Sequence, residues 1–178
     1  MIIYFVRHAS AGEHLNNPKK DEKRPLDADG IEQCSVIGRA LAALNVQPDV
    51  IVSSPLKRAT QTASLIGNEI GYEAKLQLDV AMRPEASFAD FRRMLDKHSK
   101  HEAVMLVGHN PSITDFLAKI IAKSGCEAQI DFKKGAVARV ETERRAAILH
   151  WFITPKMARE IQAAAASAAK SHPKTSRK

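Results

Sequence analysis

The sequence predicts a three-layer α/β/α domain whose central sheet is mostly parallel and carries an antiparallel hairpin at its edge. As far as residue 121, short apolar runs of strand length alternate with segments in which apolar residues recur at helical spacing. Two later apolar runs, at 136–140 and 146–152, flank the polar stretch 141–145, which is typical of a hairpin. The length of 178 residues suits one domain with a sizeable core.

The chain opens with the run Ile2–Val6, whose β-branched and aromatic residues predict a strand buried on both faces. The next helix is predicted from the helical spacing of Ile31, Cys34, Ile37, Leu41 and Leu44, and a later one begins at Pro55. The elements expected after the first strand are a polar loop at 14–24, a helix at 29–44, a strand at 49–52, a helix at 55–70 and a strand at 75–78.

The second half continues the alternation until the hairpin. Its expected elements are a helix capped by Ser87 that buries Phe88, Phe91 and Leu95, a strand at 103–108, and a helix opened by Asn110 and Pro111. An Ala-rich helix follows the hairpin. We therefore expect a domain at 1–154, a C-terminal helix at 155–170 and a basic, disordered tail at 171–178.

Composition and charge exclude several classes of protein. The formal net charge is +7, but without the four cations of the last nine residues the chain carries only +3, which suits an anionic substrate. Aromatic residues are scarce, which argues against a nucleic-acid surface, and no apolar run approaches a membrane span. Cys34 and Cys126 have no metal-binding spacing, and Met1 leads straight into the first strand; both features favour a cytoplasmic protein with reduced thiols.

Four polar residues stand at strand ends or helix starts and could share one pocket. Arg7 and His8 end the first strand, His109 follows the strand at 103–108, and Arg58 lies at the start of the helix after the second strand. Ligands bind at the carboxyl ends of strands in open α/β sheets, so these side chains are expected to converge there. Asn110 opens the helix behind His109, whose N-terminus could add amide donors to an anion site.

Electrostatics favours an anion over a metal at such a site. A guanidinium about 6 Å from a divalent cation would repel it by roughly 5 kcal/mol at an effective dielectric of 20, and the same term is attractive for a phosphate dianion. Two guanidinium forks match the oxygens of a phosphoryl group. A histidine between them would be neutral and could attack phosphorus as a nucleophile.

These residues resemble the histidine phosphatase (phosphoglycerate mutase-like) superfamily over most of residues 1–153. Its Arg-His-Gly signature is present as Arg7-His8-Ala9, its second arginine lies in the segment 53–62 as Arg58, and its second histidine is His109. The stretch Arg24-Pro-Leu-Asp-Ala-Asp-Gly30, the small size and His109-Asn-Pro111 are most similar to SixA-type phosphohistidine phosphatases.

The resemblance implies a phosphoglycerate mutase-like fold and assigns roles to the site residues. His8 would be the phosphorylated nucleophile; Arg7, Arg58 and His109 would bind the phosphoryl group with Asn110, and neither a metal nor a cofactor would be needed. Ala9 replaces the usual glycine. Larger members place an acid after the third strand, and Glu85 is the candidate here. Asp79, Asp90 or no enzyme acid remain alternatives, because a phosphohistidine substrate can protonate its own imidazole.

The expected substrate is a phosphorylated protein, because 78–103 leaves room for one helix but not for a lid domain. The alternatives are a small-metabolite phosphomonoesterase or mutase, a non-catalytic phosphate-binding module, and a nucleic-acid-associated protein that uses its basic tail. Arg24 is expected to pair with Asp21 or Glu22. The other histidines, namely His14, His98, His101, His150 and His172, are expected at surface or edge positions.

Overall fold

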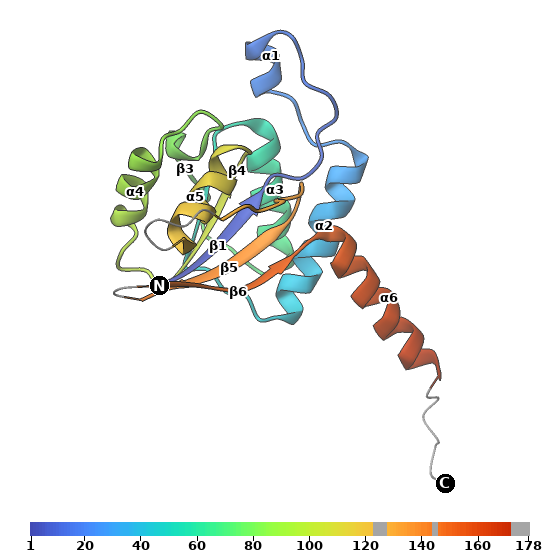
Figure 1. Ribbon diagram of the computed structural model, residues 1–178. Coiled ribbons are helices and arrows are strands. Elements are labelled where there is room, and N and C mark those ends of the chain that lie inside the picture. The colour runs from blue at the N-terminus through green and yellow to red at the C-terminus, as the bar shows by residue number, and fades with distance from the viewer. Residues whose placement is uncertain (123–127, 144–145, 172–178) are drawn as a thin grey trace.

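The computed structural model describes residues 1–122, 128–143 and 146–171, and a six-stranded sheet forms its centre (Figure 1). The strands lie in the order β3 (Gln77–Leu78), β2 (Val50–Ser53), β4 (Ala103–Gly108), β1 (Ile2–Arg7), β5 (Val137–Thr142) and β6 (Ala147–Ile153). The first four of these are parallel, whereas β5 and β6 pair antiparallel at one edge. The predicted fold class is therefore confirmed.

Helices cover both faces of the sheet (Figure 1). One apolar cluster joins the sheet to three helices, α2 (Ala28–Ala43), α3 (Lys57–Glu69) and the start of α6 (Pro155–Ser171). The other joins it to α4 (Phe88–Lys97) and α5 (Ser112–Ile121), where the rings of Phe91 and Phe116 stack 4.5 Å apart. Parallel strands with helices on both sides are buried on both faces, which is why β1 and β4 are almost continuous apolar runs.

Two helices begin at side-chain caps. Asp27 accepts a hydrogen bond from the Gly30 amide at the start of α2, and Ser87 accepts one from the Asp90 amide at the start of α4, as the sequence predicts for Ser87. Gly30 is required by close packing, because a Cβ there would lie 2.0 Å from the carbonyl oxygen of Ser10. The first turn of α2 therefore rests directly on the loop that follows β1.

Several local expectations are wrong. The polar loop at 14–24 contains a short helix, α1 (Pro18–Glu22), and a 3₁₀ turn, η1 (Val80–Met82), follows a third strand of only two residues. His98, the C-cap residue of α4, is buried and not at the surface, and its ring packs 5.4 Å from that of His101. Ile31 and Leu44, at the two ends of the apolar stripe of α2, are exposed.

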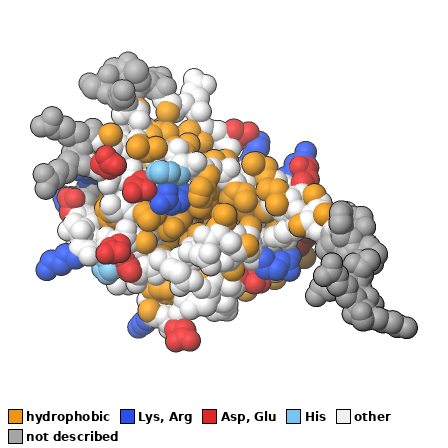
Figure 2. Space-filling model, turned by 90° about the horizontal axis from the view of Figure 1, so that it is seen from below, with side chains coloured by type: hydrophobic (Ala, Val, Ile, Leu, Met, Phe, Trp, Pro, Cys, Tyr) orange, Lys and Arg blue, Asp and Glu red, His pale blue; other side chains and the backbone are white. Residues whose placement is uncertain are grey.

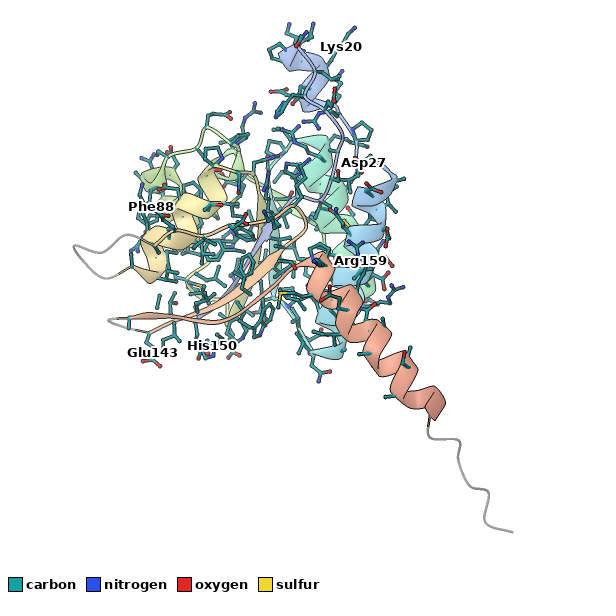
Figure 3. The ribbon with its side chains drawn as sticks, turned by 45° about the vertical axis from the view of Figure 1, so that its right-hand side comes forward. Lys20, Asp27, Phe88, Glu143, His150 and Arg159 are labelled. Carbon is teal, nitrogen blue, oxygen red and sulfur yellow. The ribbon has the colours of Figure 1, made fainter. Side chains whose placement is uncertain are left out.

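The C-terminal helix α6 packs on α2 only through its first part (Figure 1). Ala158 is buried there, Arg159 forms an ion pair with Glu32, and Gln162 Nε2 donates to the Val36 carbonyl. Residues 163–168 are exposed, and the helix leads away from the domain (Figure 3). The expected tail begins at residue 171, but Ser171 is the last residue of α6; the rest of that tail, 172–178, and Cys126 lie outside the described residues.

The view from below, opposite the end of the molecule that carries α1, shows a broad area of hydrophobic side chains (Figure 2). Exposed apolar residues on β6 and α6 include Ile148, Leu149 and Ile161. Across the described parts of the chain, none of the helices combines the length and the apolar character needed to cross a membrane.

Candidate active site

The ends of β1 and β4 bring two histidines together. The two strands pair in register, Arg7 beside Gly108, and the His8 amide donates to the Gly108 carbonyl at 2.9 Å. As a result the rings of His8 and His109 face each other with their centroids 4.8 Å apart. A Cβ at Gly108 would lie 2.9 Å from Met82 Cε, so this position favours glycine. The two imidazoles separated by a hundred residues of sequence therefore share one pocket.

His8 is held as a neutral ring with one nitrogen available. Its Nδ1 lies 2.7 Å from the carbonyl oxygen of Ala9, an acceptor only, so Nδ1 carries the proton and Nε2 the lone pair. Burial is the main reason that the pKa of His8 is lowered to about 3; the positive charges of Arg58, Arg7 and Lys134 act in the same direction, and the Ala9 hydrogen bond opposes them. A neutral imidazole with a free Nε2 is the form required of a nucleophile.

His109 is buried more deeply than His8. Its Nε2 lies 2.9 Å from the hydroxyl oxygen of Ser54, which follows β2. That hydroxyl also accepts from the Leu56 amide at 3.4 Å, so its own proton can go to Nε2, which leaves Nδ1 of His109 as an N–H donor. Burial lowers the pKa of His109 to about 2, with further contributions from His8 and the nearby arginines.

Arg58 lies in the first turn of α3 and is almost fully buried. Its Nη1 donates to the backbone carbonyl of Asp21 at 3.0 Å and to the Asp21 carboxylate at 3.2 Å. The same carboxylate accepts from Arg24 Nε at 2.7 Å, which confirms the expected pairing of Arg24. The two guanidiniums hold the pKa of Asp21 far below its usual range, so this carboxyl group is ionised and half neutralises the pair of arginines.

Arg7 is positioned by the loop that precedes β5. Its Nη1 donates to the Phe132 carbonyl at 2.6 Å, and Asn110 Nδ2 lies 3.4 Å from the same oxygen. The other end of the Asn110 amide accepts from Thr114 at 2.7 Å. The side chain of Asn110 is thus already engaged on both sides, and any role in substrate binding would require it to exchange one of these bonds.

Unpaired donors gather at this pocket. Within the described residues, four buried side-chain nitrogens have no hydrogen-bond partner, and three of them are Arg7 Nε, Arg58 Nε and His109 Nδ1. Buried donors without acceptors are costly, and a cluster of them indicates a place that an acceptor-rich ligand fills. Because two of the donors are cationic, the fitting ligand is an anion such as a phosphoryl group.

The loop after His8 is held by a network of side chains from α2 and α3. The Asp27 carboxylate accepts from the Ser10 hydroxyl at 2.8 Å and from the Gly12 amide at 2.7 Å, in addition to capping α2. Thr62 accepts from the Ala9 amide at 3.1 Å and donates to the Arg58 carbonyl at 2.8 Å. The loop after His8 and the start of α3, which carries Arg58, are therefore bound directly to one another.

The candidate acids lie apart from the histidine pair. Glu85 is exposed and its carboxylate accepts from Arg83 Nε at 2.5 Å; burial is the largest single effect and raises its pKa, but the hydrogen bond and charge of Arg83, with a backbone hydrogen bond, together leave the pKa lowered. Asp79 caps η1, and Asp90 is bound to Ser87 and Arg93 near the start of α4. None of these three carboxylates contacts His8 or His109 in the described structure, so a proton-donor role for any of them stays a prediction.

Sequence reasoning missed four residues at this site: Ser54, Asp21, Arg83 and Lys134. The positive charge of Arg83 lowers the pKa values of His109 and Arg58, and that of Lys134 lowers the pKa of His8. Of these, Asp21 carried a signal, since it stands three residues before Arg24. Among the described residues no cluster of histidine, cysteine and acidic side chains is suited to hold a metal ion.

Comparison with known proteins agrees with this geometry. Residues 3–91 match the histidine phosphatase superfamily (branch 1). The mitochondrial serine/threonine-protein phosphatase Pgam5 of Drosophila pseudoobscura pseudoobscura is 30% identical over 148 residues, which is 67% of this chain and 50% of that protein. The chain thus spans about half the length of the Pgam5 relatives it matches.

Solved structures show the same fold. The protein histidine phosphatase SixA complexed with tungstate superposes with a TM-score of 0.77 at 19% identity, over 88% of this chain and 98% of that one. SixA from Agrobacterium tumefaciens gives a TM-score of 0.71 at 23% identity, over 86% and 98%. With its sequence match, its sheet order and its paired histidines between arginines, the chain belongs to the histidine phosphatase superfamily.

Proposed function

We propose that this protein is a phosphatase that removes a phosphoryl group from phosphohistidine in another protein through a phosphorylated His8. The observation that carries the proposal is the free Nε2 of His8 beside three unpaired donors, on Arg7, Arg58 and His109. A nucleophile and the ligands for the charge that develops on phosphorus are thereby assembled in one pocket. Membership of the superfamily supports a phosphorylated substrate.

The reaction would proceed in two displacements at phosphorus. His8 Nε2 attacks the phosphoryl group, its bond to phosphorus forms as the bond to the leaving nitrogen breaks, and the leaving imidazole takes up a proton. Water then attacks the phosphorylated His8 and gives up a proton, the N–P bond breaks, and inorganic phosphate leaves. In both steps Arg7, Arg58 and His109 would hold the equatorial oxygens, where the transition-state charge is spread.

The acid–base character of the site favours phosphohistidine over a phosphate ester. An alkoxide leaving group needs an acid, but Asp21, the carboxylate bound to Arg58, is ionised with a strongly lowered pKa. Glu85 is held by Arg83, which also keeps its pKa lowered. The imidazole of phosphohistidine can carry its own proton, so this substrate does not require the enzyme to supply an acid for its leaving group.

Within the described residues, no inserted domain lies between β3 and β4 to cover the pocket. Between β3 and β4 the chain forms η1 and α4 with their connections, and α4 packs on the face of the sheet beside α5. A phosphorylated side chain on a protein surface could therefore approach from the open side.

The cytoplasm is the location that we propose for this protein. The thiol of Cys34 is buried, and burial raises its pKa to about 12; a buried, free thiol suits a reducing compartment.

A substrate panel tests the proposal. The wild-type chain is assayed with a histidine-phosphorylated protein, phosphoramidate, p-nitrophenyl phosphate, a sugar phosphate and phosphoglycerate. We expect the highest kcat/KM with the phosphohistidine protein and an acid-labile phosphoenzyme that maps to His8. Efficient turnover of the sugar phosphate or phosphoglycerate, without activity on the phosphohistidine protein, would instead identify a metabolite phosphatase. Phosphate binding without turnover of any compound would identify a binding module.

A further inference from the structure

The segment 14–24, which we call the arm, stands beside the candidate active site. Its helix α1 rises above the edge of the sheet at which β1 ends (Figure 1). Of the five residues in α1 only Asp21 is buried, so the arm is not held by an apolar core of its own. Its position relative to the pocket must therefore come from polar contacts.

Both acidic residues of α1 are bound to arginines of the pocket region. Asp21 joins Arg58, and its carboxylate also accepts from the Leu15 amide at 3.0 Å within the arm. The Glu22 carboxylate lies 2.5 Å from Arg83 Nη2. Arg24 closes the base of the arm by donating to the Ala11 carbonyl at 2.5 Å. These contacts order the arm in advance, so a partner that binds it does not have to order it.

The same contacts pair the carboxylates of the arm and leave its lysines unpaired. Asp21 and Glu22 turn toward the domain, whereas three lysines are exposed and form no ion pair with any described residue: Lys19, Lys20 and Lys23. Lys20 lies at the outer part of α1, away from the sheet (Figure 3). The arm carries four cations and two carboxylates, and both carboxylates are paired with arginines, so the unpaired charges next to the pocket are all positive.

We propose that the arm is a docking surface for the substrate protein and binds acidic side chains that flank its phosphorylated residue. The inference rests on the proposed function and deepens it, because it specifies the surface around the phosphohistidine. A small phosphorylated molecule would be held inside the pocket by Arg7, Arg58 and His109 and would not reach the lysines. A protein seated on the pocket would meet the arm, and acidic side chains would complement its charge.

Two synthetic phosphohistidine peptides test this, one flanked on each side by glutamates and one by glutamines. We expect the wild-type chain to favour the glutamate peptide in kcat/KM by about tenfold at low salt, through KM, as three exposed ion pairs would give. The preference should shrink in 0.5 M salt, because salt screens exposed charges. The screening length is already only about 10 Å at 0.1 M, and it shortens as salt is added. The variant Lys19→Glu/Lys20→Glu/Lys23→Glu should lose it while keeping the wild-type rate with phosphoramidate.

The matched control is Lys75→Glu/Lys100→Glu/Lys119→Glu, which changes the net charge equally. These lysines are also exposed and lie away from the pocket end of the sheet: Lys75 and Lys100 precede β3 and β4. Lys119 lies in the last turn of α5 and differs from the arm lysines in pairing with Asp115 at 2.8 Å, so Lys75→Glu/Lys100→Glu serves as a second control without an ion pair to break. Two results would overturn the docking role and leave the phosphatase proposal intact. One is equal kcat/KM of the wild-type chain for the glutamate and glutamine peptides; the other is an equal loss of the glutamate preference in the arm and control variants. A wild-type chain that hydrolyses neither peptide would refute both.

Discussion

At the scale of single residues, the pocket depends on keeping two imidazoles uncharged between cations. His8 is 8% exposed and His109 is 1% exposed, and each ring is further disfavoured as a cation by Arg7 and Arg58. Holding both rings neutral therefore costs folding free energy at low pH, and it keeps them in the form that the proposed reaction requires. This balance gives the first two predictions.

Replacing His8 by alanine should abolish turnover and leave the fold intact. Without the ring no atom in the pocket can form the bond to phosphorus, so the rate of phosphohistidine hydrolysis should fall by about 10⁴-fold or more. Turnover and phosphoenzyme formation are measured side by side, with circular dichroism for the fold. His150→Ala, at an exposed histidine on the edge strand β6, far from the pocket (Figure 3), is the control and should stay active. An active His8→Ala enzyme would overturn the assignment of the nucleophile.

The free energy of unfolding should decrease as the pH falls from 6.5 to 5. The folded pKa values of His8 and His109 are lowered to about 3 and about 2, so the unfolded chain binds more protons below pH 6.5 than the folded chain does. Each histidine should contribute a slope of up to about 1.4 kcal/mol per pH unit. Urea unfolding at several pH values measures the slope, and His8→Ala should reduce it; an unchanged slope in that variant would contradict the buried neutral ring.

At the scale of elements, the pocket is placed by strand ends and stabilised by helix starts. Asp27 links both roles, because one carboxylate caps α2 and fixes Ser10 and Gly12 behind the nucleophile. The cap of α4 by Ser87 has the same form, but the Ser87 hydroxyl bonds within α4 and contacts neither the loop after His8 nor the two histidines. The two caps can therefore separate a stabilising contact from a positioning one.

The variants Asp27→Ala and Ser87→Ala each remove an N-cap, but only Asp27→Ala should also change the activity. Each should lower the free energy of unfolding by about 1 kcal/mol, the usual cost of an N-cap. Only Asp27→Ala should also lower kcat, by about tenfold or more, because it frees the loop that orients His8. Chemical denaturation and steady-state kinetics give the two quantities. Equal kcat values in both variants would show that Asp27 serves α2 alone.

The elements that sequence reasoning predicted well are those whose pattern is local. The fully apolar β4 and the capped α4 follow from composition and spacing, and strand ends placed Arg7, His8 and His109 at one edge. The helix α1 could not be predicted, because it has five residues and depends on Asp21 contacting Arg58, 37 residues away. The burial of His98 and the approach of Arg83 to the pocket likewise depend on contacts that no short pattern records.

At the scale of the whole molecule, the domain and the C-terminal helix are joined by a small contact. We propose that residues 1–154 form the catalytic domain and that α6 stabilises it from outside. Only the first part of α6 meets α2, where Ala158 is 1% exposed and Gln162 binds the Val36 carbonyl. The remainder adds an exposed Ala-rich surface.

Truncation at two places tests this division. A chain that ends at Gln162 should match the full chain in unfolding free energy to within about 0.5 kcal/mol. A chain that ends at Thr154 uncovers α2 and should lose about 1–3 kcal/mol, with kcat for phosphohistidine unchanged per folded molecule. Thermal unfolding and active-site titration measure both. A loss of kcat on removal of 155–178 would place α6 within the catalytic unit.

The position of β1 between β4 and β5 has a consequence for biosynthesis. β1, which His8 follows directly, is translated before both of its neighbours in the sheet, β4 and β5, and before His109. In the nascent chain this apolar segment consequently has no sheet partner until about a hundred further residues have emerged, and the two imidazoles can meet only after β4 has formed beside it.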